Sequence, residues 1–582
     1  MKHQLFSSFM VCSALFASMA TSSVPEQADR EPEAATGLYQ QALVQARDYM
    51  VAAAHPLATQ AGTSILAQGG SAMDAAVAVQ LVLGLVEPQS SGIGGGAFIL
   101  HWDQQEQHMT TFDGRETAPQ SADGSLFMQG DTAMPWREAY VGGKSVGVPG
   151  LFASLYQAHQ RYGMLPWSDL FTDAIRLAED GFPVSDRMAA QLAVGWNRGI
   201  KHSTAASHYF YPEGQPLQAG EIITNPAYAE VLRQVAAEGP EAFYQGDNAT
   251  ALVQTVQQAR VNAGQLSLND LAEYTAVERA PVCGRYRSYQ VCGMAPPSSG
   301  GVAVLQILGL LERFDMADLA ADSLEAIHLF SQASQLAFVD RDHYLADADF
   351  VQVPVDELVH PDYLTQRSAL INPDKAFTTV AAGQPIAELA RISTASPELP
   401  NTSHFSIVDS KGNAVSLTSS IENVFGSGLM VNGYLLNNQL TDFSLSPEED
   451  GHLVANRVEG GKRPRSSMAP VMVFDDEGAL RFVLGSPGGS RIINYVAQTL
   501  VALIDWQLDI QSAINLAKIT HRNDFLALEK GTAITAHQAA LEQMGHQVRV
   551  IDLNSGLHGI VITASGLEGG ADPRREGQVL GH

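Results

Sequence analysis

The sequence predicts an α+β protein, with helices dominating the first part of the chain and strands the second. Helical patterns run over 55–68, 71–85 and, most regularly, 323–344. After residue 401, short strand-like segments follow one another, among them FSIVD, AVSLTSS, VMVFDD and LRFVLGS. Of the 582 residues, 45% are hydrophobic and 16% are charged, so the chain can bury a large core.

Capping residues, glycines and strand patterns support these predicted elements, taken here in the order of the chain. The first helix ends at two glycines, and Ser71 provides a polar N-cap for the second. Strands predicted over 98–102 and 109–112 pair with each other and deliver Arg115 to the end of the second strand. A G-x-G-x-x-A pattern begins at Gly92, but a strand follows it instead of the helix that a dinucleotide site needs. We therefore expect no nucleotide cofactor.

The first twenty residues have the pattern of a secretory signal peptide. Lys2 precedes an apolar stretch over 9–16, and small residues stand at positions 18 and 20. The apolar stretch is shorter than the roughly 20 residues needed to span a bilayer. We predict that residues 1–20 are removed on export and that 21–36 form a disordered lead. The mature protein is expected to be periplasmic or secreted, with no membrane span.

Charge and histidine spacing bear on the possible partners. The formal charge of -28 argues against nucleic acid, whose binding depends on concentrated Lys and Arg. The 17 histidines show no paired spacing with Cys, Asp or Glu of the kind that zinc requires. We therefore expect neither a nucleic-acid partner nor a metal ion.

Two cysteines remain once the signal peptide is removed. Cys283 and Cys292 flank a segment that can fold back and place the two sulfur atoms opposite each other. In an exported protein this spacing favours a disulfide. Two unpaired thiols stay an alternative, because cross-strand geometry often fails the limits of the bond.

The stretch LPNTSHFSIVDSKGNAVSLTSS predicts a β-hairpin with a polar end. A turn over 410–413 joins its strands, and counting back from the turn sets Ser403 opposite Ser420. The next pair is then Thr402 with Ile421, within an error of about one residue. The hydroxyl of Ser420 is expected within roughly 5 Å of Thr402.

Thr402 has no obvious His and Asp pair in this stretch to activate its hydroxyl. A cut before Thr402 would release an α-amine with a reference pKa of about 7.7 to 8.0, low enough to serve as the base. The turn-rich connector over 393–401, with two prolines, is expected to be exposed. These features give a physical reason for Thr402 to become a chain terminus, and an ordinary edge strand with a polar end is the alternative.

Eight segments carry a family resemblance through their order along nearly the whole mature chain. They are GGSAMDAAVAVQLVLGLVEPQSSGIGGGAFIL, DGRETAP, MAPPSSGG, TSHFSIVDSKGNAVSLT, LLNNQLTDFS, KRPRSSM, GSPGGSR and GGADPRREG. Together they resemble the γ-glutamyltranspeptidases, or glutathione hydrolases, of the N-terminal nucleophile hydrolase superfamily. The resemblance implies a four-layer αββα sandwich, in which two antiparallel sheets pack face to face between helices.

The resemblance also implies self-cleavage between Asn401 and Thr402. The large subunit would comprise 37–401 and the small one 402–582, held together as a heterodimer without a cofactor. Thr402 would then attack the γ-glutamyl amide of a donor such as glutathione. The acyl group would pass to water or to an acceptor amino acid or peptide.

Residue roles follow from the resemblance by matched motif. Arg115 would bind the donor α-carboxylate with its planar guanidinium, and Asp442, with Gln439, would bind the α-ammonium. Backbone N–H groups of a Gly-Gly pair would face the oxyanion. The expected catalytic residues are Thr402, Ser420, Gly488 and Gly489, and the expected donor-binding residues are Arg115, Thr418, Glu422, Gln439, Asp442, Ser466 and Ser467.

Two departures from the family pattern stand out. Glu422 occupies a position where well-known members have Asn, which changes the charge beside the donor. The segment over 444–461 is shorter than the lid-bearing versions and lacks their covering Tyr. A more open site for larger γ-glutamyl donors would follow.

Other functions are compatible with parts of the sequence. A cephalosporin acylase of the same architecture acts on a glutaryl amide, which lacks the α-ammonium and has less use for Asp442. A depolymerase of poly-γ-glutamate is another member of the set. An uncleaved, inactive binding homologue is disfavoured by the intact Asn-Thr junction.

Overall fold

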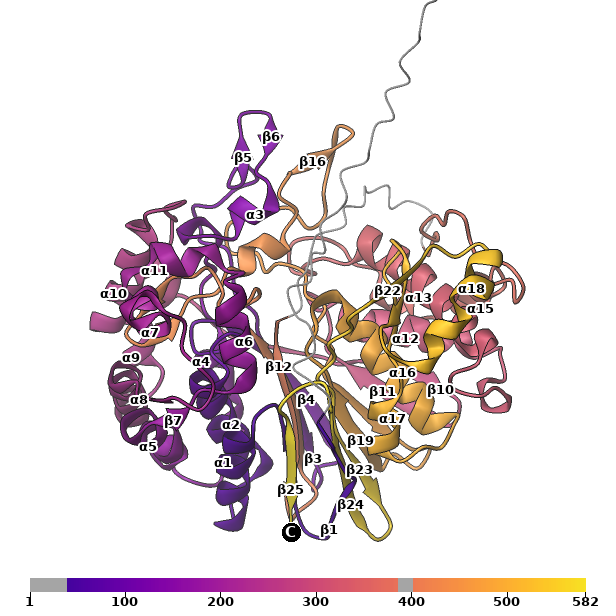
Figure 1. Cartoon of the computed structure of the whole chain (residues 1–582), viewed down its shortest axis with the longest axis horizontal. Coiled ribbons are helices and arrows are strands. Elements are labelled where there is room, and N and C mark those ends of the chain that lie inside the picture. Colours follow the sequence, from indigo (N-terminus) through magenta and orange to yellow (C-terminus); the bar gives the residue numbers. More distant parts are fainter. Residues whose placement is uncertain (1–38, 386–400) are drawn as a thin grey trace, which may run out of the picture.

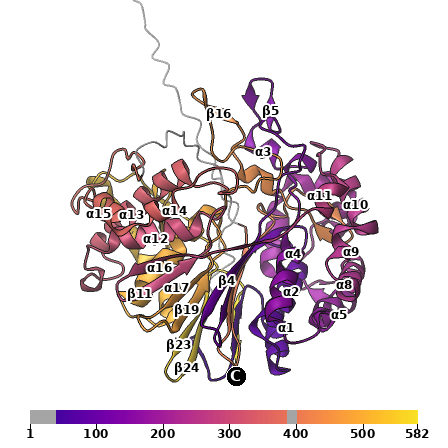
Figure 2. The ribbon, with the colours of Figure 1, turned by 180° about the vertical axis from the view of Figure 1, so that it is seen from behind.

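The computed structural model describes residues 39–385 and 401–582. The predicted signal peptide over 1–20 and the lead over 21–36 lie outside this range. Two sheets of seven strands each pack face to face, and helices cover the outer face of each sheet (Figures 1 and 2). The four-layer αββα architecture expected from the sequence is confirmed. No helix in the described ranges is long and apolar enough to cross a membrane.

The first sheet carries the predicted hairpin at its centre, and neighbouring strands in it are antiparallel. In spatial order its strands are β25 (Gln578–Gly581), β2 (Met50–Ala53), β12 (Ser403–Val408), β13 (Ala414–Ser420), β3 (Gly96–Asp103), β4 (His108–Gly114) and β9 (Val277–Arg279).

The second sheet is antiparallel throughout as well. In spatial order its strands are β1 (Val44–Ala46), β24 (Gly566–Ala571), β23 (His558–Thr563), β19 (Leu480–Gly485), β18 (Val471–Phe474), β11 (Tyr289–Gly293) and β10 (Val282–Tyr286). Each sheet therefore combines strands from before and after residue 401.

Helices from the first part of the chain cover the first sheet, and a mixed set covers the second (Figure 1). The first set includes α1 (Pro56–Ala67), α2 (Ala72–Val86), α4 (Leu151–Tyr162), α5 (Thr172–Asp180), α6 (Asp186–Val194), α7 (Thr204–Phe210), α8 (Pro226–Glu238), α9 (Glu241–Tyr244), α10 (Gly246–Gln257) and α11 (Leu268–Ala272). The second includes α12 (Gly300–Leu311), α13 (Leu324–Tyr344), α14 (Val355–Leu358), α15 (Pro361–Ser368), α16 (Ile492–Ile504), α17 (Ile510–Asn515) and α18 (Gln538–Gln543).

Small elements complete the structure. They are α3 (Trp136–Ala139), the pairs β5 (Met128–Gln129) with β6 (Thr132–Ala133), β7 (Phe182–Pro183) with β8 (Ile222–Ile223), β14 (Met430–Val431) with β15 (Tyr434–Leu435), and β16 (Glu448–Glu449) with β17 (His452–Leu453), and the sheet of β20 (Ile519–His521), β21 (Leu526–Glu529) and β22 (Val548–Ile551).

Helix boundaries follow the capping signals of the sequence. Ser71 caps α2, accepting from the N–H of Asp74, whose carboxylate accepts from the N–H of Ser71 in return. Ser323 caps α13 in the same position. The predicted helices therefore begin and end within one residue of the observed ones.

Alternation along β12 decides which way each side chain points. Phe405 and Ile407 are buried against the helices on the outer face of the first sheet. His404 and Ser406 lie on the other face, where Ser406 Oγ donates to the carbonyl of His558 on β23 of the second sheet. Thr402 continues this second set and faces the second sheet.

The register of the hairpin differs from the predicted one by one residue. Ser403 pairs with Ser419, and Val408 with Ala414, so Thr402 lies beside Ser420 and not Ile421. The turn is five residues long because the carboxylate of Asp409 accepts from the backbone N–H groups of Lys411 and Asn413 and holds Asp409 in the loop.

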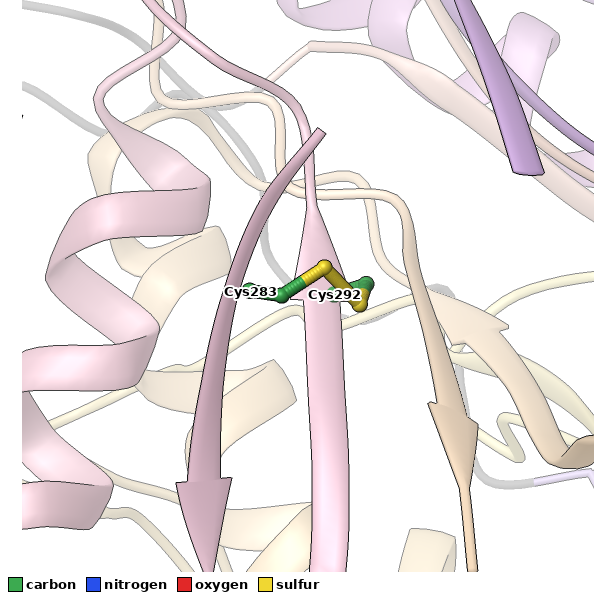
Figure 3. Close-up of a disulfide and its surroundings, with 2 residues drawn as sticks. All are labelled: Cys283 and Cys292. Carbon is green, nitrogen blue, oxygen red and sulfur yellow. A yellow bond between two sulfur atoms is a disulfide. The ribbon is translucent and has the colours of Figure 1, made fainter. Parts of the chain in front are cut away.

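Cys283 and Cys292 are directly opposed on β10 and β11, and their sulfur atoms are bonded (Figure 3). The two-residue turn between the strands contains Arg287 with φ of 53°. The disulfide thus links the strand β10, which ends the second sheet, to its neighbour β11.

Replacing both cysteines with alanine should lower the free energy of unfolding by about 2 to 3 kcal/mol, because the bond closes a short loop in the unfolded chain. Urea unfolding midpoints of the wild type and the double variant measure the difference. The wild type in reductant should behave like the variant. Equal midpoints for oxidised wild type and variant would contradict a stabilising role.

Candidate functional site

Thr402 stands immediately before β12, with its hydroxyl turned toward the loop that follows β19. The backbone N–H of Gly488 donates to Thr402 Oγ1 at 3.1 Å. Gly488 has φ of 132° and Gly489 of 57°, values that a residue with a Cβ rarely adopts. The glycine pair thus lets a backbone donor reach the threonine hydroxyl just before α16 begins.

The carbonyl of Asn401 is held by the hydroxyl of Ser420. Ser420 Oγ donates to Asn401 O at 2.9 Å and accepts from the N–H of Glu422 at 2.8 Å. Asn401 is buried, which corrects the expectation of an exposed connector at this position, while 393–400 lies outside the described residues. These contacts polarise the carbonyl of the peptide bond that precedes Thr402.

Arg115 and Asp442 form a buried ion pair in the same pocket as the junction, the peptide bond between Asn401 and Thr402. Arg115 follows directly after β4, and its Nη2 lies 2.5 Å from Asp442 Oδ2, which also accepts from Gln439 Nε2 at 2.7 Å. Arg115 Nε donates to the carbonyl of Pro464 at 3.1 Å. A guanidinium and a carboxylate fixed side by side suit a ligand that carries both charges.

The hydroxyl groups of Ser466 and Ser467 each accept a hydrogen bond from the protein. The N–H of Met468 donates to Ser466 Oγ at 3.2 Å, and Arg341 Nη2 donates to Ser467 Oγ at 2.6 Å. Each hydroxyl can therefore donate its own hydrogen to an acceptor in the pocket. A carboxylate near Arg115 would be such an acceptor.

Glu422 and Thr418 have different surroundings. Glu422 has φ of 74°, lines the same pocket, and its Oε2 accepts from Asn438 Nδ2. Thr418 does not line that pocket, because it lies further along β13 and its Oγ1 is 2.9 Å from His404 Nδ1 between the sheets. Burial holds the pKa of His404 well below its usual range.

One pocket collects most of the residues expected from the sequence. Of the expected residues only Thr418 and Gly488 are not part of its wall, and Gly488 contacts Thr402 directly. The wall is formed by Arg115, Asn401, Thr402, Ser420, Glu422, Gln439, Asp442, Ser466, Ser467, Met468, Gly489 and Ile492.

The segment over 444–461 forms the β16–β17 hairpin, which projects beside the β5–β6 hairpin at the top of Figure 1. Pro447 would lie 2.6 Å from a Cβ added at Gly124, so the hairpin packs against the segment between β4 and β5. The chain just before the hairpin therefore contacts a segment that precedes residue 401.

Sequence reasoning missed several residues at or near the site. Met468, which follows Ser467, and Ile492, three residues after Gly489, are apolar and had no signal of their own. Arg575, in the segment GGADPRREG, donates to the carbonyl of Thr402 at 3.4 Å. Glu87 and Arg187 lie buried behind the junction, and only the isolated charge of Glu87 after a long apolar stretch could have marked the pair.

Glu116, next to Arg115, was also missed. Its side chain is fully buried, with Oε2 at 3.8 Å from Arg115 Nη1. Burial raises the pKa of Glu116 to about 8 against the opposing effect of Arg115. Near neutral pH this carboxyl therefore holds a proton while Asp442 forms the close contact with Arg115.

The titration of Glu116 should make stability depend on pH. Below the ordinary pKa of 4.5 both folded and unfolded chains hold the proton, and between 4.5 and about 8 only the folded chain does. Rising pH in that range therefore favours unfolding, by at most about 5 kcal/mol. Urea midpoints at pH 5 and pH 8 should show a smaller loss of stability in Glu116→Gln than in the wild type.

An exposed carboxylate provides the control for this experiment. Glu278 pairs with Arg161, and both side chains are 46% exposed. Glu278→Gln should leave the pH dependence of the wild type unchanged. If Glu116→Gln behaves in the same way as Glu278→Gln, the assignment of the pH dependence to Glu116 is wrong.

The sequence of this chain was compared with those of known proteins and protein families. The family model described as γ-glutamyltranspeptidase matches residues 58–582. The glutathione hydrolase proenzyme of Bacillus subtilis (strain 168) is 35% identical over 97% of this chain and 96% of its own length. That of Escherichia coli (strain K12) is 37% identical over 91% of each chain.

A solved structure shares the fold of this chain. The cephalosporin acylase from Bacillus halodurans has a TM-score of 0.83 and 28% sequence identity, covering 93% of this chain and 97% of that chain. The fold is therefore shared with an acylase, and the sequence matches extend over nearly all the described residues. The chain belongs to the γ-glutamyltranspeptidase family.

Proposed function

We propose that the chain is a self-cleaving γ-glutamyl hydrolase and transferase in which Thr402 is the nucleophile. One observation carries the proposal: the Thr402 hydroxyl, with the Gly488 N–H on its oxygen, shares a pocket with the Arg115–Asp442 pair. A nucleophile, a backbone N–H donor beside it and a binding site for a zwitterionic head group thus meet in one place.

The first reaction is cleavage of the chain. Thr402 Oγ1 attacks the carbonyl carbon of Asn401, the C–N bond breaks, and the amine of Thr402 takes up the proton lost by the hydroxyl. Ser420, which donates to Asn401 O, stabilises the negative charge that develops on this oxygen. Water then hydrolyses the ester between Asn401 and Thr402.

The second reaction is turnover of the donor. The Thr402 hydroxyl attacks the γ-carbonyl carbon while the α-amine accepts the proton and passes it to the leaving amine. The N–H groups of Gly488 and Gly489 face the oxyanion. Water, or the amine of an acceptor amino acid or peptide, then attacks the acyl-enzyme and restores the hydroxyl.

Cleavage between Asn401 and Thr402 defines two subunits, and the signal peptide determines where the enzyme is located. The large subunit, 37–401, and the small subunit of 181 residues (582 minus 401) remain together as a heterodimer. Each sheet contains strands from both subunits, which supports a stable association. With the signal peptide over 1–20 removed, the mature enzyme resides in the periplasm or is secreted.

Donor selection separates this proposal from a glutaryl acylase. The α-carboxylate is common to γ-glutamyl and glutaryl groups, so Arg115, Ser466 and Ser467 serve either substrate. Only the γ-glutamyl group has an α-ammonium, for which Asp442 and Glu422 provide negative charge in the pocket wall. The second carboxylate at Glu422 adds to this preference for an ammonium.

The test compares hydrolysis of γ-glutamyl and glutaryl p-nitroanilides by the purified, cleaved enzyme. We expect kcat/KM to be at least about tenfold higher for the γ-glutamyl substrate, the effect of roughly 1.4 kcal/mol of ammonium binding. Addition of an acceptor dipeptide should increase release of p-nitroaniline if transfer occurs. A higher kcat/KM for the glutaryl substrate would favour the acylase.

A further inference from the structure

A buried ion pair lies behind the junction that is proposed to be cleaved. Glu87 is the C-cap residue of α2, and Arg187 lies in the first turn of α6. Arg187 Nη1 is 2.7 Å from Glu87 Oε1 and also donates to Ser90 Oγ at 2.9 Å, and each side chain of the pair is 1% exposed. The pair is therefore fixed in position by two helices of the large subunit (Figure 1).

This pair contacts the residues on either side of Thr402. Arg187 Nη2 donates to Asn401 Oδ1 at 3.3 Å. Glu87 Oε2 accepts from Ser403 Oγ at 3.0 Å, and Ser91 Oγ donates to the same Ser403 oxygen at 3.0 Å. The two residues that flank the nucleophile are thus tied to one another through a single ion pair.

The contacts come from the face of the chain opposite the pocket. Alternation along β12 turns Ser403 toward α2, while Thr402 and Ser420 face the second sheet. Holding Asn401 and Ser403 from behind leaves Thr402 between two fixed points. The Asn401 carbonyl then meets Ser420 Oγ, and the Thr402 hydroxyl meets the Gly488 N–H.

We infer that Glu87 and Arg187 are positioning residues for cleavage of the bond between Asn401 and Thr402, an inference that rests on the proposed self-cleavage. The pair neither donates nor removes a proton in the step. It restricts the junction to the arrangement in which hydroxyl and carbonyl react, and misplacement by about 1 Å can cost roughly a hundredfold in rate. Neither residue lines the donor pocket, and cleavage removes the bond to Asn401 that the pair positions, so turnover should depend on the pair much less than cleavage does.

The experiment measures cleavage of purified precursor on denaturing gels over time. Arg187→Met should slow the appearance of the two subunits at least about tenfold, because it removes the donor to Asn401 and the partner of Glu87. Glu87→Gln, which keeps the shape and removes the charge, should slow it less. Material that has finally cleaved should show wild-type KM for a γ-glutamyl anilide and a much smaller loss in kcat than in the rate of cleavage.

A matched variant separates positioning from general stability. Arg367 and Asp340 form another buried pair, at 3.0 Å, among the helices that cover the second sheet. Arg367→Met should lower the melting temperature but cleave at the wild-type rate. Melting temperatures of Arg187→Met and Arg367→Met are compared in the Thr402→Ala background, where neither chain is cut.

A double-variant cycle tests the contact itself. If Arg187 acts through Asn401, the delays caused by Arg187→Met and Asn401→Ala should not multiply when combined. Cleavage of Arg187→Met at the wild-type rate, or delays that multiply fully, would overturn the inference. An uncleaved wild-type chain would instead overturn the proposed function, so the two failures are distinguishable.

Discussion

Thr402→Ala is expected to remain a single uncleaved chain and to lose at least about 10³-fold in γ-glutamyl hydrolysis, because one hydroxyl serves both reactions. The structure predicts that the variant folds, since the substitution removes chiefly the hydrogen bond from the Gly488 N–H to Thr402 Oγ1. Denaturing gels detect cleavage, anilide hydrolysis measures the loss of activity, and mass spectrometry of the wild-type small subunit identifies its first residue. An N-terminal Thr402 in the wild-type small subunit would locate the cut.

Thr402→Ser is the matched control for this experiment, because it keeps a hydroxyl at the same position. We expect it to cleave itself and to turn over substrate, more slowly than the wild type since the β-methyl group no longer restricts the side chain. Substantial activity in Thr402→Ala would contradict the assignment of Thr402 as the nucleophile. A wild-type protein that stays as one band after long incubation would favour the inactive binding homologue.

The parts of the fold that the sequence predicts well are those with local signals. Ser71 and Ser323 start helices through hydrogen bonds to groups three residues away, which a sequence pattern displays directly. The strands before Arg115 also follow from local alternation. The layering of two sheets came from the family resemblance, since composition and periodicity allow several arrangements.

The hairpin register shows the limit of local reasoning. The turn at Asp409 has five residues instead of four, because its carboxylate captures two backbone N–H groups of the loop. A shift of one residue changes which side chains share a face, and it replaces Ile421 by Ser420 as the neighbour of Thr402. The prediction that Ser420 lies close to Thr402 still holds, because the register was predicted with an error of about one residue and differs by one residue.

The residues behind the junction could not be assigned from the sequence. Glu87 and Ser403 are 316 positions apart, and Arg187 and Asn401 are 214 apart, so only the tertiary fold brings them together. The raised pKa of Glu116 arises from burial, which a charged residue beside Arg115 does not reveal. Long-range contacts and desolvation are therefore where the structure adds most to the site.

Asp442→Asn is the second substitution with a large expected effect. It removes the carboxylate that lies 2.5 Å from Arg115 and replaces it with a neutral amide in a buried pocket. Loss of a charge-assisted contact with the donor α-ammonium should lower kcat/KM for a γ-glutamyl anilide by about 10²-fold, equivalent to roughly 3 kcal/mol. The same change should affect the glutaryl anilide much less, since that substrate has no ammonium.

The difference between the two substrates is what assigns the role of Asp442. Leaving Arg115 without its partner lowers the free energy of unfolding, by about 3 to 5 kcal/mol for a buried pair. Any displacement of Arg115 that results should lower kcat/KM for both substrates alike, because both carry the carboxylate that Arg115 binds. Glu116, at 3.8 Å, can offset part of the lost stability by releasing its proton to the solvent and becoming the counter-ion of Arg115. A selective loss with the γ-glutamyl substrate therefore reports contact with its ammonium, whereas equal losses would show that Asp442 acts only by holding Arg115 in place.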